Sequence, residues 1–141
     1  MIKLDSKILT ILVNFLLIIW QLPQTIIGLI ALAVFRDFKI YTNEFNHITV
    51  INVNKGNLFG TACFSLGPVI LTTTNCSEVA KRHETGHSKQ SIYLGPLFFV
   101  IAFISIPRFW IYRLLNKPYT WYISGWPESS AERLGGTKEL K

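Results

Sequence analysis

Two histidines and a glutamate stand close together in the segment KRHETGHSKQSIYLGP, residues 81–96. On a helix, His83 and His87 would lie one turn apart on the same face, with Cβ atoms about 5–6 Å apart. Two imidazoles at that spacing can bind one zinc ion, with bonds of about 2.0–2.1 Å. Glu84, one position further on, can take a proton from water at the ion without being a ligand. This HExxH pattern predicts a catalytic zinc site; the alternative is a solvated polar turn.

A catalytic zinc ion needs a third protein ligand, and the segment PESSAERLGG, residues 127–136, offers one. It opens with a proline and closes with glycines, which is typical of a short helix. Glu128 and Glu132 would share one face of that helix. We expect Glu128 to be the third ligand, and Glu132 to accept a hydrogen bond from the other ring nitrogen of a ligating histidine. The alternative is an ordinary acidic first turn with Arg133 nearby.

A structural zinc site would normally add a fourth protein ligand. The remaining residues with suitable donor atoms are His47, Cys63 and Cys76. The cysteines lack the paired spacing of structural zinc sites. They could form a disulfide in an oxidising compartment, but two free thiols are the simpler interpretation. This shortage of a fourth ligand favours the open coordination of a catalytic site.

The element that carries the histidines is predicted to be a helix over Glu78–Leu94. Asn75 or Ser77 can cap its start, and an acidic residue in the first turn suits the helix dipole. Gly95–Pro96 should end the helix, because the residue before a proline avoids the α region. Such a helix would hold both imidazoles on one face.

Three short strands are predicted before this helix. HITVINVN, residues 47–54, alternates and is β-branched. A KGN turn leads to a second strand near Leu58–Leu66, and Gly67–Pro68 leads to a third at Val69–Thr73. We expect a small antiparallel meander, in which each strand pairs with the next. Three strands with one apolar face are not stable alone, so they must pack on a helix or on a membrane-embedded part.

The composition predicts a membrane protein. Half of the 141 residues are hydrophobic and only 16% are charged, against about 25% charged in ordinary soluble domains. Ile8–Phe35 carries no charge, and Ile92–Trp110 carries none before Arg108; about 20 apolar residues suffice to cross a bilayer. The first run is longer than the apolar region of a signal peptide, the alternative that we considered.

We therefore expect two parts. Residues 1–39 would form an N-terminal transmembrane anchor, kinked at Pro23. Residues 40–141 would form a minimal zinc-peptidase-like domain with a membrane-embedded segment at 92–115. The expected fold class is an α+β membrane protein with a β-meander, the HExxH helix, an apolar helical hairpin and a C-terminal ligand helix.

The zinc hypothesis constrains the second apolar run. A straight span from Ile92 to Trp110 would separate its two ends by about 30 Å, on opposite sides of the bilayer. Pro96 and Pro107 enclose a helix too short to cross, and ISIP at Ile104–Pro107 could turn the chain back. We expect a re-entrant hairpin with both arms returning to the zinc. A kinked span beside a water-filled cavity is the alternative.

At this point a family resemblance is visible. HExxH followed by a second helix with ExxxD or ExxxE is similar to the gluzincin metallopeptidases. ESSAERLGG, residues 128–136, resembles the E-x-x-A-D-R-x segment of the membrane-bound CAAX prenyl protease/HtpX group. HETGHSKQSIYLGPLFF, residues 83–99, resembles short bacterial membrane proteins that carry HEYGH-x-x-QS-x-x-LGPLY after a SLG strand, here Ser65–Gly67. Glu132 stands for the usual Asp, and Thr85 for the aromatic residue.

The resemblance implies the roles of individual residues. His83, His87 and Glu128 would bind zinc, and Glu84 would be the general base. A strand would hold the substrate by edge pairing; its residues are Ala62, Cys63, Phe64, Ser65 and Leu66. Peptide hydrolysis also needs a donor to the oxyanion, for which the candidates are Tyr119, Tyr122 and Arg133.

The sequence thus predicts a membrane-bound zinc peptidase that hydrolyses a peptide bond near the membrane surface through a zinc-activated water. The alternatives are a non-enzymatic membrane accessory protein with a degenerate or structural metal site, or a small membrane toxin. We expect the bilayer and a peptide or membrane-protein substrate as partners, while a homodimer stays open. A net charge of +6 without a basic stripe does not indicate nucleic-acid binding. We expect a bacterial inner membrane, with the polar part on the cytoplasmic side.

Overall fold

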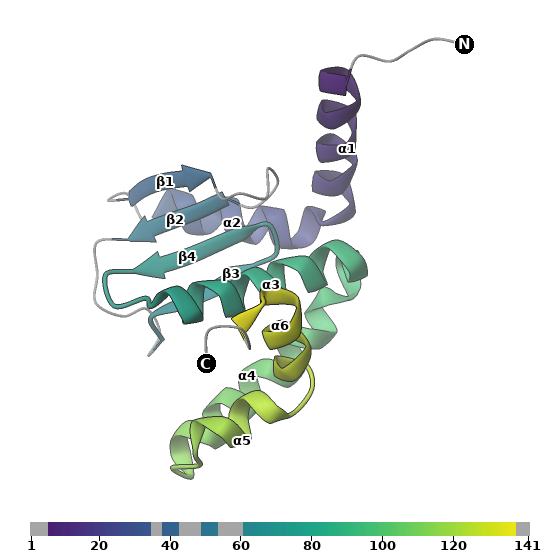
Figure 1. Cartoon of the computed structure of the whole chain (residues 1–141). Coiled ribbons are helices and arrows are strands. Elements are labelled where there is room, and N and C mark those ends of the chain that lie inside the picture. Colours follow the sequence, from purple (N-terminus) through teal and green to yellow (C-terminus); the bar gives the residue numbers. More distant parts are fainter. Residues whose placement is uncertain (1–5, 35–37, 43–48, 54–60, 138–141) are drawn as a thin grey trace.

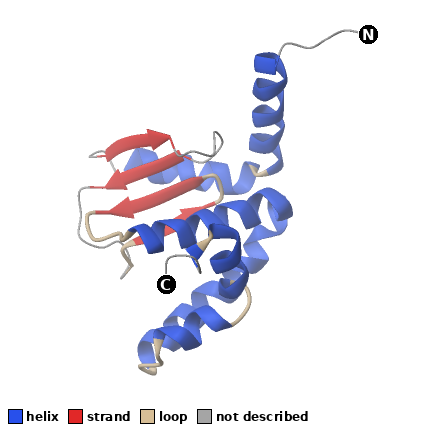
Figure 2. Ribbon diagram, in the orientation of Figure 1, coloured by secondary structure: helices blue, strands red, loops and turns tan. Residues whose placement is uncertain are grey.

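The computed structural model describes residues 6–34, 38–42, 49–53 and 61–137, which form helices around one small sheet (Figures 1 and 2). The elements are α1 (Ser6–Trp20), α2 (Leu22–Val34), β1 (Phe38–Thr42), β2 (Thr49–Val53), β3 (Cys63–Leu66), β4 (Val69–Thr73), α3 (Glu78–Leu94), the 3-10 turn η1 (Gly95–Leu97), α4 (Phe98–Leu114), α5 (Tyr119–Ser124) and α6 (Glu128–Gly135). The expected combination of helices with a small sheet is observed. The helix that carries HExxH has the predicted bounds.

The sheet is mixed, so the predicted antiparallel meander is wrong. Its strand order is β1-β2-β4-β3. β2 runs parallel to β4, while β1 pairs with β2 and β3 with β4 in antiparallel fashion. Every residue of β4 is buried, which favours a central position between two strands and two layers. β1 at the far edge was not predicted, and β3 lies at the other edge rather than in the middle.

Helices cover both faces of the sheet. Ile51, Val53, Val69 and Leu71 form a buried cluster on the face covered by α2, where Gly28 of α2 lies directly over Val69. α3 lies on the opposite face, with α6 beyond it (Figure 1). The sheet is therefore the middle of three layers, and α3 is buried between the sheet and α6.

The N-terminal apolar run forms two helices rather than one kinked anchor. The axes of Lys7–Trp20 and Leu22–Ala31 differ by 88°. The break lies beside Pro23, where a kink was expected, but it is close to a right angle. α1 projects away from the molecule, whereas α2 packs against the sheet (Figure 1). Both helices are apolar, so the sequence alone does not show which of them packs on the sheet. The buried Gln24 and Gly28 identify α2 as the packed helix.

The chain reverses between α3 and α4, and not at Ile104–Pro107 as predicted. Ser105 and His87 both contact Glu128, although a straight helix would separate them by about 27 Å. The reversal lies at η1, where Gly95 has φ 52° and ψ −129°. α4 continues through Pro107 without a break. Apolar surroundings tolerate proline in a helix when neighbouring groups satisfy the freed carbonyl.

The surface of the molecule has two apolar helices. On α4, Phe103 is 78% and Leu114 is 75% exposed, and most of the large side chains of α1 are exposed as well. By length and composition alone, the helical stretch Glu78–Leu114 could cross a membrane. α1 with α2 would add a second candidate if the bent pair formed one span.

Candidate metal centre

The start of α3 is determined locally. The Ser77 hydroxyl accepts a hydrogen bond from the backbone N–H of Ala80 (3.2 Å), as expected for an N-cap. Glu78 in the first turn pairs with Lys81 at 2.9 Å. From this start, one turn separates His83 from His87, and their rings meet edge to face at 4.9 Å between centroids. Both imidazoles therefore lie on the face of α3 that α6 covers.

Two glycines allow α6 to lie very close to α3. A Cβ atom on Gly86 would be 2.0 Å from the carbonyl oxygen of Ala131, and one on Gly135 would be 2.1 Å from that of Arg82. Both contacts are with backbone, which cannot move aside like a flexible side chain. The glycine inside HETGH thus brings the two helices close enough for side chains of α6 to reach both histidines.

Both histidines point at the same carboxylate oxygen. His83 Nε2 lies 2.9 Å from Glu128 Oε2, and His87 Nε2 lies 3.1 Å from the same oxygen. His83 and His87 are almost completely buried, and Glu128 is completely buried. The ligand atoms of these three residues all lie within 4.8 Å of one another. The structure thus brings together the three side chains that the sequence predicted as ligands.

The other ring nitrogens have partners that orient each imidazole. His83 Nδ1 lies 2.9 Å from Glu132 Oε1, and His87 Nδ1 lies 2.7 Å from Gln90 Oε1. Both partners offer acceptor oxygens, so each Nδ1 donates a proton to its partner and each Nε2 faces Glu128. Gln90 is itself held by the Pro127 carbonyl, which accepts from Nε2 at 3.0 Å. Both imidazoles are therefore oriented as a metal site requires, with Nδ1 held by a second residue.

Glu128 is held on its other side by α4. The Ser105 hydroxyl donates a hydrogen bond to Oε1, and burial together with the nearby Glu128 carboxylate raises the pKa of the Tyr122 phenol. Burial by itself raises the pKa of Glu128, but the hydrogen bonds from His83 and His87 outweigh it and lower the pKa well below its usual range. Glu128 is therefore an anion inside the protein, as a metal ligand must be.

The arrangement fits a metal ion. Ligand atoms of a tetrahedral zinc site lie about 3.3 Å apart, given bonds of about 2.0–2.1 Å. The two separations between imidazole nitrogen and carboxylate oxygen, 2.9 and 3.1 Å, are within a few tenths of an ångström of that value. Two imidazoles and one carboxylate also match the donor set of catalytic zinc sites. The buried cluster could therefore bind a metal ion.

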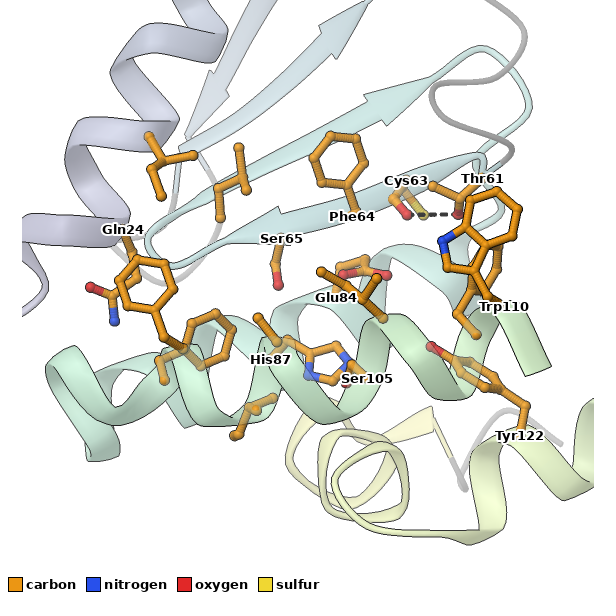
Figure 3. A pocket seen from close by; sticks show the side chains of 18 residues that line it. Gln24, Thr61, Cys63, Phe64, Ser65, Glu84, His87, Ser105, Trp110 and Tyr122 are labelled. Carbon is orange, nitrogen blue, oxygen red and sulfur yellow. Dashed lines mark hydrogen bonds between the residues drawn. The ribbon is translucent and has the colours of Figure 1, made fainter. Parts of the chain in front are cut away.

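A cavity of about 380 Å³ opens next to this cluster, between β3 and α4 (Figure 3). Glu84 and His87 lie on its floor, and most of the other lining side chains are apolar. Glu84 belongs to α3 but is not one of the three grouped ligands. Glu84 and Ser65 of β3 both line the cavity. A free carboxylate thus lies beside the candidate metal position and beneath the edge strand.

The predicted substrate strand forms one wall of this cavity. Within the described part of the chain, β3 pairs only with β4, so its other edge faces the cavity. The lining includes Cys63, Phe64, Ser65 and Leu66 but not Ala62. Cys63 and Cys76 are free thiols, as the simpler interpretation expected.

Of the three expected oxyanion donors, only Tyr122 lines the cavity (Figure 3). Ser105 and Glu84 line the same cavity as Tyr122. Tyr119 is 46% exposed, and Arg133 is exposed on α6; neither lines the cavity. The remaining histidine of the sequence, His47, lies outside the described residues.

Sequence reasoning missed three residues of the site. Gln90 follows His87 by three positions, so it lies on the same helix face and was detectable by spacing. Ser105 stands out as a hydroxyl within the apolar α4, a signal that was overlooked. Gly86 lies inside the HExxH pattern, at one of the two positions that the pattern leaves open. Its role depends on the neighbouring helix, which no local pattern reveals.

Comparisons of the chain with protein-family models, with curated proteins and with solved structures find no match. Its function must therefore be argued from the geometry of this site.

Proposed function

We propose that the chain is a membrane-associated, zinc-dependent peptidase. The observation that carries this proposal is the convergence of two imidazole nitrogens on one oxygen of Glu128, directly beside a cavity that contains the carboxylate of Glu84. An ordinary cluster of buried polar residues would need neither a free carboxylate nor an open cavity at that point.

The donor set favours zinc among the common metal ions. Two imidazoles and one carboxylate suit zinc, whereas magnesium and calcium prefer oxygen donors alone. Bound by His83, His87 and Glu128, zinc would supply a positive charge that polarises the scissile carbonyl and lowers the pKa of water. The described residues offer no fourth ligand within the group, which leaves a position open for the substrate.

Glu84 is proposed as the general base. It would take a proton from the attacking water and then deliver it to the nitrogen of the leaving amine, so that one carboxylate serves both steps. The apolar walls of the cavity exclude bulk water and strengthen the electrostatic interactions inside. Glu84 lines the cavity together with Ser65 of β3.

Tyr122 and β3 are proposed to hold the substrate. The phenol hydroxyl of Tyr122 can donate a hydrogen bond to the oxyanion that forms at the scissile carbonyl. The open edge of β3 can pair with an extended peptide, whose main-chain groups would continue the sheet. A peptide lying along β3 would pass directly over Glu84.

The exposed apolar faces of α1 and α4 support an association with lipid. Apolar patches of that extent are rare on monomeric soluble proteins. α4 also forms one wall of the cavity, so the site would lie close to the apolar part of the bilayer. The substrate would then be a peptide segment at or near the membrane surface.

The zinc content of the protein purified in detergent tests this proposal first. We would measure it by elemental analysis for the wild type, His87→Ala and Glu84→Gln, together with cleavage of a mixture of quenched fluorescent peptides. About one zinc per chain is expected in the wild type and in Glu84→Gln, and none after purification of His87→Ala. Cleavage should require both His87 and Glu84.

The outcomes separate the proposed peptidase from the alternative of a non-enzymatic accessory protein. Zinc in the wild type, with cleavage that Glu84→Gln abolishes, supports catalysis. Zinc with identical behaviour of the wild type and Glu84→Gln against every peptide supports a structural metal site. Absence of zinc from protein prepared without chelator would rule out the peptidase.

A further inference from the structure

Arg108 is an unusual residue at its position. It belongs to α4, in which the only other charged side chain is Arg113 in the last turn. Arg108 is half-buried, whereas Arg113 is exposed. An arginine in an apolar helix is costly unless its donors are satisfied. Its partners therefore indicate what it does.

The guanidinium group of Arg108 binds the C-terminal end of α5. Its Nε donates to the carbonyl oxygen of Tyr122 at 2.8 Å, and its Nη2 donates to the carbonyl oxygen of Trp121. The last carbonyls of a helix have no partner within that helix, and a cation there also interacts well with the helix dipole. A helix of six residues such as α5 is not stable by itself, so this contact fixes its position on α4.

The guanidinium group has two further close neighbours. Its Cζ atom lies 4.3 Å from the centre of the Trp121 ring, a cation–π contact. On another side lies Gly125, where a Cβ atom would be only 2.4 Å from Cζ. Any larger residue at position 125 would displace the guanidinium. Trp121 and Gly125 thus form a slot that matches the planar fork of arginine and not the single ammonium of lysine.

The residue whose carbonyl Arg108 binds is the one that reaches the metal centre. Tyr122 lines the cavity beside Glu84 and Ser105. Ser105 lies one turn before Arg108 on the same face of α4 and holds the other side of Glu128. One face of α4 therefore supports both Tyr122 and Glu128.

We infer that Arg108 is a positioning residue that fixes the phenol of Tyr122 at the metal centre by clamping the backbone of α5. The contribution of this clamp to catalysis rests on the proposed peptidase function, but the clamp itself does not. The alternative is that Arg108 only interacts with lipid at the surface of α4. That alternative predicts that substitutions of Arg108 have no effect on Tyr122.

The test is ¹⁹F NMR of the full chain in detergent, with 3-fluorotyrosine introduced at position 122 alone. Arg108→Gln should shift and broaden this resonance, because α5 loses both bonds to its C-terminal carbonyls. Arg108→Lys should shift it as well, since one ammonium cannot bridge two carbonyls. Arg113→Gln, a matched change on the same helix, should leave it unchanged. A 3-fluorotyrosine at Tyr93, which is 71% exposed on α3, should report no change in any variant.

An unchanged Tyr122 resonance in Arg108→Gln, with Tyr93 also unchanged, would overturn the inference. Should Arg108→Gln not fold, which a collapsed Tyr93 signal would reveal, Arg108→Lys decides: a native Tyr122 resonance in that variant is equally contradictory. Equal shifts in Arg108→Gln and Arg113→Gln would also overturn the inference, because they would indicate a general effect of charge on α4.

Kinetics add a second readout if a substrate is found. Arg108→Lys should lower kcat about tenfold with KM nearly unchanged, and should have no further effect in a Tyr122→Phe background. Additive losses in the double variant would show that Arg108 does not act through Tyr122. If no variant, including the wild type, cleaves any peptide, the proposed function fails, while the NMR result still decides the role of Arg108.

Discussion

Two groups of buried polar side chains lie on α3, and they differ in how completely they are paired. The metal cluster, formed by His83, His87 and Glu128 with the partners of each, joins α3 to α6 and α4. The helix junction joins the C-terminal half of α3 to α2; its members are Gln21, Gln24, Ser88 and Ser91. Among the described residues, every ligand and partner side chain in the metal cluster has a contact. In the helix junction, Gln24 Oε1 and the Ser88 hydroxyl have no hydrogen-bond partner.

The difference shows what each group contributes. In the metal cluster, side chains of α3, α4 and α6 converge on Glu128, and each imidazole is held by a second residue. Such convergence is what preorganises a metal site. In the helix junction, Gln24 and Trp20 donate to the carbonyls of Gly95 and Ile92 at the end of α3. That arrangement ends a helix and joins two layers, and it contributes no side chain to the three grouped ligands.

The largest expected effect is that of Gly86→Ala. The added methyl group would meet the Ala131 carbonyl at 2.0 Å, so α6 must move away and take Glu128 with it. We expect zinc affinity to fall at least 100-fold, and the free energy of unfolding to fall by about 3 kcal/mol. Competitive titration against a zinc chelator and thermal unfolding in detergent would measure both.

Thr85→Ala is the matched control for that change. Thr85 is the neighbouring buried residue, and its hydroxyl bonds only to the Lys81 carbonyl of its own helix. We expect the free energy of unfolding to fall by less than about 1 kcal/mol and the zinc affinity to stay unchanged. A Gly86→Ala protein that binds zinc like the wild type would contradict the close packing of α3 on α6.

Gln90→Leu should have a smaller effect, confined to the metal. It removes the acceptor that orients His87 and leaves the rest of the cluster in place. Loss of such a partner usually lowers metal affinity about 10- to 100-fold. Gln24→Leu, the same substitution in the helix junction, should leave zinc affinity unchanged. Equal losses in the two variants would erase the distinction between the two groups.

Local signals predicted the metal cluster better than they predicted the sheet. The bounds of α3 follow from Ser77 and Gly95, and the spacing of Glu128 and Glu132 places both on one face. These features depend on residues within one turn of each other. For the same reason the turn at Gly67–Pro68 was predicted correctly, because it connects two strands that are adjacent in the chain.

The remaining features depend on contacts between distant segments. The parallel pairing of β2 with β4 is set by burial on both faces, which an alternating pattern in β2 does not reveal. The prediction that the chain reverses at Ile104–Pro107 was wrong. Pro107 does not break α4, and the turn is made at Gly95, which has a positive φ. Ser105 and Arg108 become meaningful only after α4 has folded back on the metal cluster.

The smallest expected effects concern a matched pair in the helix junction. Ser88 and Ser91 lie one turn apart on α3 and are both completely buried. Within the part of the chain that the structure describes, only the Ser91 hydroxyl has a partner, since it donates to Gln21 Oε1. Ser91→Ala should therefore lower the free energy of unfolding by about 1–3 kcal/mol, because it leaves the buried side-chain carbonyl of Gln21 unpaired. Ser88→Ala removes a hydroxyl that has no partner, so it should be neutral or slightly stabilising.

Thermal unfolding of both serine variants, with zinc content measured in parallel, checks this pair. Zinc content should stay at the wild-type value in each, because neither serine contacts a ligand. Equal destabilisation by the two substitutions would mean that Ser88 has a partner in solution, such as an ordered water. A loss of zinc in either variant would extend the metal cluster into the helix junction. Retention of zinc together with unequal stabilities would show that α3 serves two separate tasks: holding the layers together, and holding an ion.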